Sequence, residues 1–97
     1  MAITPIYFHH ETSDGKTHEP VRVFVADKIA AERSAHMQGW EWRDSPQIHT
    51  LMGFYAVKRV TGGDFPDYKE WLATLVDYEM TNTLNDKDDA EDPTQAV

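Results

Sequence analysis

The stretch "SPQIHTLMGFYAVKRVTGG" (residues 45–63) predicts the helix on which the rest of the chain packs. Its serine is a strong N-cap residue, and the proline that follows suits the first helical position, where a missing N–H costs no hydrogen bond. Apolar residues recur at helical spacing along one stripe, namely Ile48, Leu51, Met52, Tyr55 and Ala56. Phe54 and Val57 make a second side apolar. We therefore expect a central, largely buried helix over residues 46–61.

Residues 3–25 predict a β-hairpin in front of this helix. Asp14-Gly15 is a typical pair for a two-residue type I′ turn, which requires positive φ at both positions. With that turn Phe8 lies opposite Val21, and the alternation of side chains assigns one face of the hairpin to the core. This core face carries Ile6, Phe8, Val21, Val23 and Val25, and the other face carries Tyr7, His9, Arg22 and Phe24.

Two further helices are expected, at about residues 27–38 and 65–79. Asp27 can cap the first of them and Gly39 can end it, while Asp64 can start the second. The apolar face of the first helix is thin and consists of Ile29, Ala30, Arg33 and Met37. The expected buried stripe of the second consists of Tyr68, Trp71, Leu72 and Leu75.

These elements indicate an α+β fold, in which an N-terminal β-hairpin packs on a bundle of about three α-helices. Residues 1–80 form a single compact domain in this interpretation. Residues 81–97 carry five acidic side chains, one basic side chain and no aromatic residue. Such a segment has too little apolar surface to offset its ordering entropy, so we expect a flexible, disordered acidic tail.

The formal net charge of −8 divides evenly between the expected domain and the tail. Residues 1–80 hold 12 acidic and 8 basic side chains (−4), and residues 81–97 hold 5 and 1 (−4). This balance argues against nucleic-acid binding, which requires clustered Lys and Arg. The chain has no cysteine, no apolar run near the ~18 residues of a membrane span and no signal-peptide pattern. We expect a soluble protein of the cytoplasm, without a membrane or nucleic-acid partner.

Catalytic and metal-binding motifs are not evident among the histidines, serines and glycines. His9 and His10 are adjacent in a strand, so they point to opposite faces and cannot hold one ion together. None of the serines sits in a strained strand-to-helix elbow that would expose a nucleophile. Gly62-Gly63 fits the end of a helix and has no phosphate-loop pattern around it. We expect a protein that is not an enzyme, with no catalytic residue, no metal and no cofactor.

Aromatic residues outside the expected core are the candidates for a protein-binding surface. Trp40, Trp42 and Arg43 lie in the connection between the first two helices, and Tyr7 and Phe24 lie on the second face of the hairpin. Trp, Tyr and Arg dominate the hot spots of protein interfaces. In the alternative interpretation, one or both tryptophans close the core where the helices meet. Because the apolar face of the first helix is thin, self-association into a homo-oligomer is a further possibility.

Several segments follow one another in an order that is typical of one viral family. They are "VRVFVAD", "AAERSA", "GFYAVKRVTG", "DFPDYKEWLATLVDYEM" and "EDPTQ". This order resembles the small tail assembly chaperones of long-tailed, siphovirus-like bacteriophages, particularly those of actinobacterial hosts. The residues that match the family pattern are Phe54, Tyr55, Ala56, Arg59, Phe65, Trp71 and Leu72. The resemblance covers roughly residues 20–93, and the N-terminal hairpin strand has no counterpart in it.

The resemblance implies a function without catalysis. Family members bind the long tape-measure protein, keep its hydrophobic helices soluble and help tail-tube subunits assemble around it, and they are absent from the finished virion. Many are made in two lengths by a programmed ribosomal frameshift. The acidic tail would then be the linker at which the shorter product stops and the longer product continues.

Two other functions remain open from the sequence. The first is a small acidic phage regulatory or inhibitor protein that binds a host protein by imitating the charge of DNA. Half of the excess negative charge lies in residues 81–97, which disfavours this hypothesis because an inhibitor of that kind needs an ordered acidic face. The second is a structural head–tail adaptor, which would be part of the purified virion.

Overall fold

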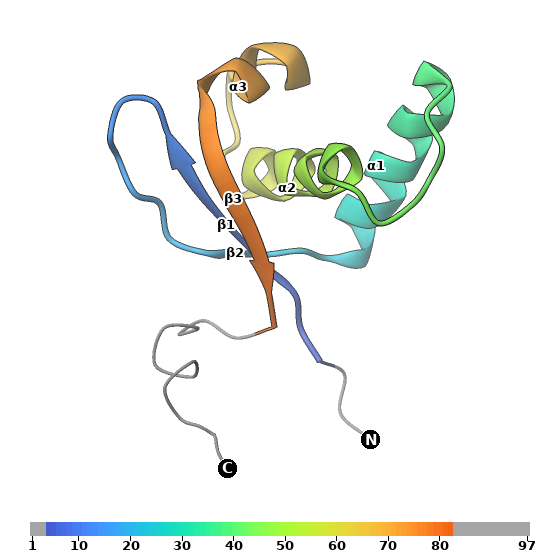
Figure 1. Ribbon diagram of the computed structural model, residues 1–97, viewed down its shortest axis with the longest axis horizontal. Helices are drawn as coiled ribbons and strands as arrows, with labels where there is room; N and C mark the ends of the chain where they lie inside the picture. Colours follow the sequence, from blue (N-terminus) through green and yellow to red (C-terminus); the bar gives the residue numbers. More distant parts are fainter. Residues whose placement is uncertain (1–3, 83–97) are drawn as a thin grey trace.

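The computed structural model describes residues 4–82, which form a three-stranded sheet and three helices (Figure 1). The elements are β1 (Tyr7–Thr12), β2 (Val21–Arg22), α1 (Val25–Gln38), α2 (Pro46–Thr61), α3 (Tyr68–Thr74) and β3 (Leu75–Thr81). This arrangement confirms the α+β class. None of the helices within residues 4–82 has the length and apolar character needed to cross a membrane. Of the expected acidic tail, residues 83–97 lie outside the described residues, and Thr81 is the last residue of β3.

Helix α2 lies between the sheet and α1, as its two apolar sides predict (Figure 1). Its buried residues are Ile48, Thr50, Leu51, Gly53, Phe54, Ala56 and Val57. Phe54 and Val57 pack with Phe8 of β1, whereas Ile48 and Leu51 pack with the alanines of α1. The predicted boundaries are confirmed, because the Ser45 hydroxyl accepts a hydrogen bond from the Ile48 N–H and the helix ends at Gly62.

Helix α1 turns a different face to the core from the one that its apolar residues predict. Ala31 and Ala35 are buried against α2, while Ile29 is 47% exposed and Met37 is 84% exposed. Small side chains allow the two helix backbones to approach closely, so the alanines make the contact although larger apolar residues are present on the helix. The thin apolar face predicted for this helix is therefore not the face that packs on the core, whereas Gly39 ends the helix as predicted.

The first turn of α1 is closed by a buried carboxylate that also binds α2. Phe24, not Asp27, is the N-cap residue, and the Asp27 carboxylate accepts the Phe24 N–H over 2.8 Å. Arg59 of α2 donates from Nε to Asp27 Oδ1 over 3.1 Å and from Nη2 to Asp27 Oδ2 over 3.0 Å. The same Nη2 donates to the carbonyl oxygen of Arg22 over 2.8 Å. The Asp27 residue is only 3% exposed, and its ion pair with Arg59 joins α1 to α2, while Arg59 also bonds to β2.

The hairpin between β1 and β2 has the predicted register at Phe8 and a different turn, next to which Glu11 pairs with Thr17. Phe8 pairs with Val21, as expected. The loop contains three residues, because the Gly15 N–H donates to the Thr12 carbonyl over 3.0 Å and only Gly15 is needed at positive φ (82°). The Asp14 carboxylate holds this loop by accepting the Thr12 hydroxyl over 2.6 Å. The predicted two-residue type I′ turn is therefore wrong.

The predicted helix over residues 65–79 is wrong at both ends. Asp67, not Asp64, caps α3, with its carboxylate accepting the Glu70 N–H over 2.8 Å. After seven helical residues the chain continues as β3, which pairs antiparallel with β1 and makes the sheet order β2-β1-β3. Leu75, Tyr78 and Met80 of this strand pack on the core, whereas Val76 is 60% exposed. Tertiary pairing has overridden a helical spacing of apolar residues, which is common for short segments.

Helix α1 begins at Val25, two residues earlier than expected, which changes the position of Val25. The hairpin was expected to bury this residue on its core face, but Val25 is the first residue of α1 and is 70% exposed. The other members of that face keep their places, since Phe8 and Val23 are buried and Ile6 and Val21 pack against them. The strand alternation therefore predicts the core contacts only up to the point where the strand ends.

The sheet approaches α2 most closely where Phe8 lies on Gly53. Phe8 is fully buried, and a Cβ atom added at Gly53 would overlap its ring. Glycine lowers helix stability by about 1 kcal/mol relative to alanine. Its presence in the middle of α2 is explained by the ring that occupies the space of a side chain.

We expect Gly53→Ala to lower the free energy of unfolding by about 1 to 3 kcal/mol, because the overlap with Phe8 outweighs the gain in helix propensity. Urea unfolding followed by circular dichroism measures this change. The double variant Gly53→Ala/Phe8→Leu serves as the control, and its loss should be smaller than the sum of the two single losses. A Gly53→Ala protein as stable as the wild type would contradict this account of the contact.

Candidate functional site

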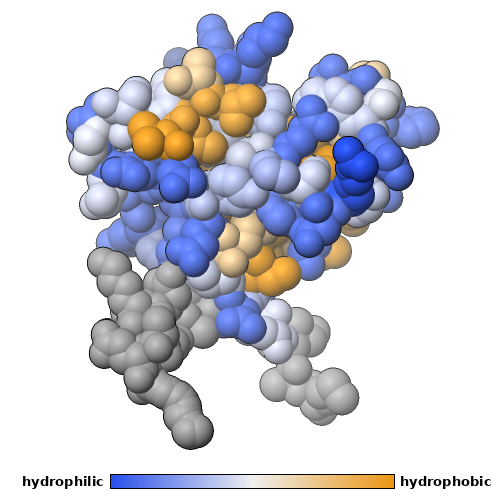
Figure 2. All heavy atoms as spheres, in the orientation of Figure 1, coloured by the Kyte–Doolittle hydropathy of each residue, from blue (hydrophilic) through white to orange (hydrophobic). Residues whose placement is uncertain are grey.

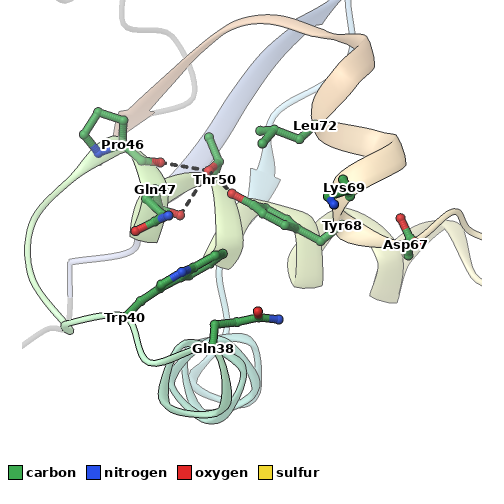
Figure 3. Close-up of a pocket in the computed structure, with 9 residues that line it drawn as sticks. All are labelled: Gln38, Trp40, Pro46, Gln47, Thr50, Asp67, Tyr68, Lys69 and Leu72. Carbon is green, nitrogen blue, oxygen red and sulfur yellow. Dashed lines mark hydrogen bonds between the residues drawn. The ribbon is translucent and has the colours of Figure 1, made fainter.

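An open groove lies between the end of α1, the start of α2 and α3 (Figure 3). Its volume is about 620 Å³. The residues that line it are Gln38, Trp40, Pro46, Gln47, Thr50, Asp67, Tyr68, Lys69 and Leu72. Trp40, Tyr68 and Leu72 supply large apolar surfaces, and amide or charged side chains surround them. We refer to this site as the Trp40 groove.

Tyr68 forms a rigid wall of the Trp40 groove. Its hydroxyl lies 2.9 Å from the hydroxyl of Thr50, which in turn donates to the Pro46 carbonyl over 2.8 Å, so Tyr68 acts as the donor in the first bond. The Tyr68 ring packs edge-on against Phe54 with 5.6 Å between the ring centroids. A hydrogen bond at one end and a ring contact at the other fix the orientation of this side chain, as the close-up shows for the hydroxyl end (Figure 3).

Trp40 reaches the groove because of the way in which α1 ends. Gly39 adopts the left-handed conformation (φ 78°), and the Trp40 N–H donates to the Ala35 carbonyl over 2.8 Å. This cap turns the indole back over the helix, where it is half-buried and lies 6.1 Å from the Tyr68 ring. Trp40 thus packs on the core cluster of α1 and α2 and also contributes surface to the groove.

Leu72 supplies an exposed apolar surface beside the polar rim of the groove. The side chain is 38% exposed, whereas Trp71, its neighbour in α3, is buried against Phe54. Asp67 and Lys69 place opposite charges near it, and Gln38 and Gln47 offer amide groups. An apolar floor with a mixed polar rim suits the apolar face of a helix from another protein chain.

The five predicted partner-binding residues fall in separate parts of the fold. Trp40 lines the groove, while Trp42 is 44% exposed in the same connection and Arg43 lies 3.8 Å from Glu41 on the surface. Tyr7 is half-buried in β1, paired with Arg22 of β2.

Phe24, the fifth predicted residue, has a structural contact of its own. Its ring is 46% exposed and lies under the guanidinium of Arg59, at 3.8 Å from ring centroid to Cζ. This stacking holds Arg59 in place for its ion pair with Asp27. The ring therefore belongs to the contact that joins α1 to α2, and it presents its other side to solvent.

Two residues of the groove, Tyr68 and Leu72, were expected in the buried stripe of the last helix. Trp71 and Leu72 are adjacent and so lie about 100° apart around a helix, which allows one of them to be buried while the other lies at the edge of the apolar face. Once α3 begins at Tyr68 and buries Trp71, Leu72 must lie at the surface. The groove itself depends on three segments that are distant in sequence, so no local pattern could indicate it.

A chain of polar groups links α2 to β3. The His49 ring bonds to Asp44 through Nε2 and lies 2.9 Å from the Tyr78 hydroxyl through Nδ1. Burial, followed by the charges of Asp44 and Asp77, raises the pKa of Tyr78. Its phenol therefore stays protonated at neutral pH and acts as a hydrogen-bonding tie. Within residues 4–82, no three His, Cys, Asp or Glu side chains are close enough together to hold a metal ion.

His10 is a buried imidazole on the core side of β1. Only 8% of the residue is exposed, and its ring stacks on His18 with 4.3 Å between the ring centroids. Its Nδ1 atom has no hydrogen-bond partner within residues 4–82. Burial, and to a smaller extent the charge of His18, lowers the pKa of His10 from 6.5 to about 4. The folded protein therefore holds this ring neutral.

No protein-family model, no curated protein and no solved structure matches the chain. The function must therefore be inferred from the Trp40 groove and from the sequence pattern of α2 and α3. The N-terminal strand β1 lies on the opposite side of α2 from α1 and does not line the Trp40 groove (Figure 1).

The lowered pKa of His10 predicts a loss of stability in acid. The unfolded chain takes up a proton at His10 below about pH 6.5 and the folded protein only near pH 4, so stability falls as the pH decreases through this window. We expect His10→Phe, which keeps a stacked ring and cannot be protonated, to lose about 1 to 3 kcal/mol less between pH 7 and pH 4 than the wild type. Urea unfolding at a series of pH values measures this difference, and parallel curves would refute it.

Proposed function

We propose that this protein is a tail assembly chaperone of a long-tailed bacteriophage, which binds the tape-measure protein and keeps it soluble while the tail assembles. It acts in the host cytoplasm, carries out no chemical reaction and leaves before the virion is complete. Its partner is the tape-measure protein, and tail-tube subunits are further candidates. A second copy of the chain is a third candidate, because α1 exposes Ile29 and Met37 to solvent.

The observation that supports this proposal most is the Trp40 groove. A tape-measure protein contains long apolar helices, and a holding protein needs an apolar surface that is open to such a helix and does not close on itself. The Trp40 groove presents Trp40, Tyr68 and Leu72 in an open trough whose wall is fixed by the hydrogen bond from Tyr68 to Thr50. A preorganised wall lowers the entropy cost of binding.

The resemblance to the chaperone family supports the same function. Among its matching residues, Phe54 and Trp71 pack against Tyr68 of the groove, whereas Arg59 holds α1 through Asp27 at the other end of the helix pair. Leu72 is the matching residue that lines the groove. The motif of the family is thus compatible with a role in shaping one partner-binding surface.

The acidic residues 81–97 have a place in this proposal as the linker at which a frameshifted product would continue. Segments rich in one sign of charge repel one another, which keeps a complex with an apolar partner dispersed. Because residues 83–97 lie outside the described residues, this part of the proposal depends on the sequence alone.

We expect Leu72→Asp to weaken binding of the tape-measure protein at least tenfold, because a carboxylate in the apolar groove cannot be desolvated without a partner. The tape-measure protein of the same genome is co-expressed with the chain, and its soluble fraction and co-purification are measured. Val60→Asp is the matched control, since Val60 is exposed near the end of α2 and does not line the groove. Circular dichroism checks that both variants are folded.

Two outcomes separate the parts of this proposal. If the wild-type chain neither solubilises nor retains the tape-measure protein, the function is wrong. If the wild type binds it and Leu72→Asp binds equally well, the function holds and the groove is not the site.

A further inference from the structure

Strand β3 forms one edge of the sheet. The strand order β2-β1-β3 places β1 on one side of it, and no strand within residues 4–82 pairs with its other side. β3 is seven residues long, whereas the opposite edge, β2, has only two residues before the chain enters α1. The longer edge is therefore the one that offers a row of backbone groups to another chain.

The hydrogen bonding of Tyr78 shows which groups face outward. Its N–H donates to the carboxylate of Asp77 over 2.8 Å and so does not belong to the ladder with β1. In an antiparallel pair, residues alternate between those bonded to the neighbouring strand and those directed away from it. Tyr78 and Met80, two positions apart, therefore direct their N–H and C=O groups to the outer edge.

The side chains beside this edge are acidic. Asp77 and Glu79 are exposed on the sheet face that turns away from α2, next to the exposed Glu11 of β1. Tyr78 and Met80 alternate with them and pack on the core cluster. His9, which pairs with Glu79, is the basic side chain among these neighbours. The edge thus combines the outward-directed backbone groups of Tyr78 and Met80, which pair with no strand within residues 4–82, with a local excess of negative charge.

This charge selects among the possible occupants. In an antiparallel pair of two copies centred on Tyr78, each Asp77 would lie directly opposite Glu79 of the other copy. Like charges that lie directly opposite each other destabilise the pairing of strands. A strand with acidic side chains would meet the same repulsion. A strand with Lys or Arg at alternate positions would instead form cross-strand ion pairs with Asp77 and Glu79.

We propose that the outer edge of β3 binds an extended segment of a partner protein that carries Lys or Arg at alternate positions, which adds a fourth strand to the sheet. Asp77 guards this edge in the free protein by occupying the Tyr78 N–H. On binding, a carbonyl of the incoming strand takes over this N–H, and the released carboxylate pairs with a basic side chain. This site is separate from the Trp40 groove and does not depend on the tail assembly function.

The test uses the full chain and a short synthetic peptide in which Lys and Val alternate. We expect the peptide to slow hydrogen exchange at the Tyr78 and Met80 amides and to bind with a Kd measurable by fluorescence anisotropy. The control is the same peptide with every backbone nitrogen methylated, which keeps the charge and cannot join a ladder. Equal binding of the methylated peptide would overturn the proposal, because only diffuse attraction to an acidic protein would then remain.

Variants of the chain distinguish the edge from the general charge of the protein. Asp77→Lys/Glu79→Lys should bind the Lys/Val peptide at least tenfold more weakly, whereas Asp64→Lys, in an exposed loop, should leave its Kd within about twofold. If Asp64→Lys weakens binding as much as the double variant, the proposed site is wrong. Circular dichroism shows whether each variant is folded.

The guarding role of Asp77 has its own test, which uses an uncharged peptide of alternating Thr and Val. Asp77→Asn keeps an oxygen that can accept the Tyr78 N–H, and Asp77→Ala does not. Both variants lack the charge, so they differ mainly in the guard. We expect the Thr/Val peptide to bind Asp77→Ala about fivefold more tightly than Asp77→Asn, which corresponds to one hydrogen bond of ordinary net strength. Equal affinities would show that Asp77 does not guard the edge.

Discussion

The ion pair between Asp27 and Arg59 is the contact on which the arrangement of the helices depends. Asp27 is 3% exposed and accepts hydrogen bonds from the Phe24 N–H and from the guanidinium of Arg59. A carboxylate buried without such partners would cost several kcal/mol, so the start of α1 is stable only when the end of α2 lies beside it. The stacking of Phe24 on Arg59 and the bond from Arg59 to the Arg22 carbonyl fix the same corner.

The ion pair between Asp27 and Arg59 and the Trp40 groove lie at opposite ends of the helix pair α1 and α2. Asp27 lies in the first turn of α1, and Arg59 lies in the last turn of α2. The end of α1 and the start of α2 line the Trp40 groove. Between them, the contact of Ala31 and Ala35 with α2 keeps the two helices close. α3 then closes the third side, and Leu72 remains exposed there. In Figure 2 apolar residues reach the surface in separate areas, over α3 and the start of β3 and again where β2 runs into α1. The fold thus leaves apolar side chains exposed to solvent in these areas.

Local patterns in the sequence predict α2, whose boundaries and buried sides depend on neighbouring residues of the chain. The cap and the apolar stripes of residues 46–61 predict this helix. The pairing of Phe8 with Val21 was expected from a two-residue turn, and the structure reaches it with a three-residue loop and Glu11 opposite Thr17. β3 was missed because its pairing joins Tyr7 to Thr81, and a strand whose partner is so distant carries no local signal. The buried face of α1 was missed because alanines and an aspartate form it. Of the residues that line the groove, Trp40 was among the predicted partner-binding residues, whereas Leu72 was assigned to the core.

A double-mutant cycle on Asp27 and Arg59 tests most directly whether this pair fixes the fold. The free energy of unfolding is measured for the wild type, Asp27→Asn, Arg59→Gln and the double variant, at low and at high salt. We expect each single change to cost several kcal/mol and the coupling energy to be about 2 to 3 kcal/mol. Salt should reduce the coupling energy little, because Asp27 is buried. A coupling energy below about 0.5 kcal/mol, or one abolished by salt, would contradict this expectation.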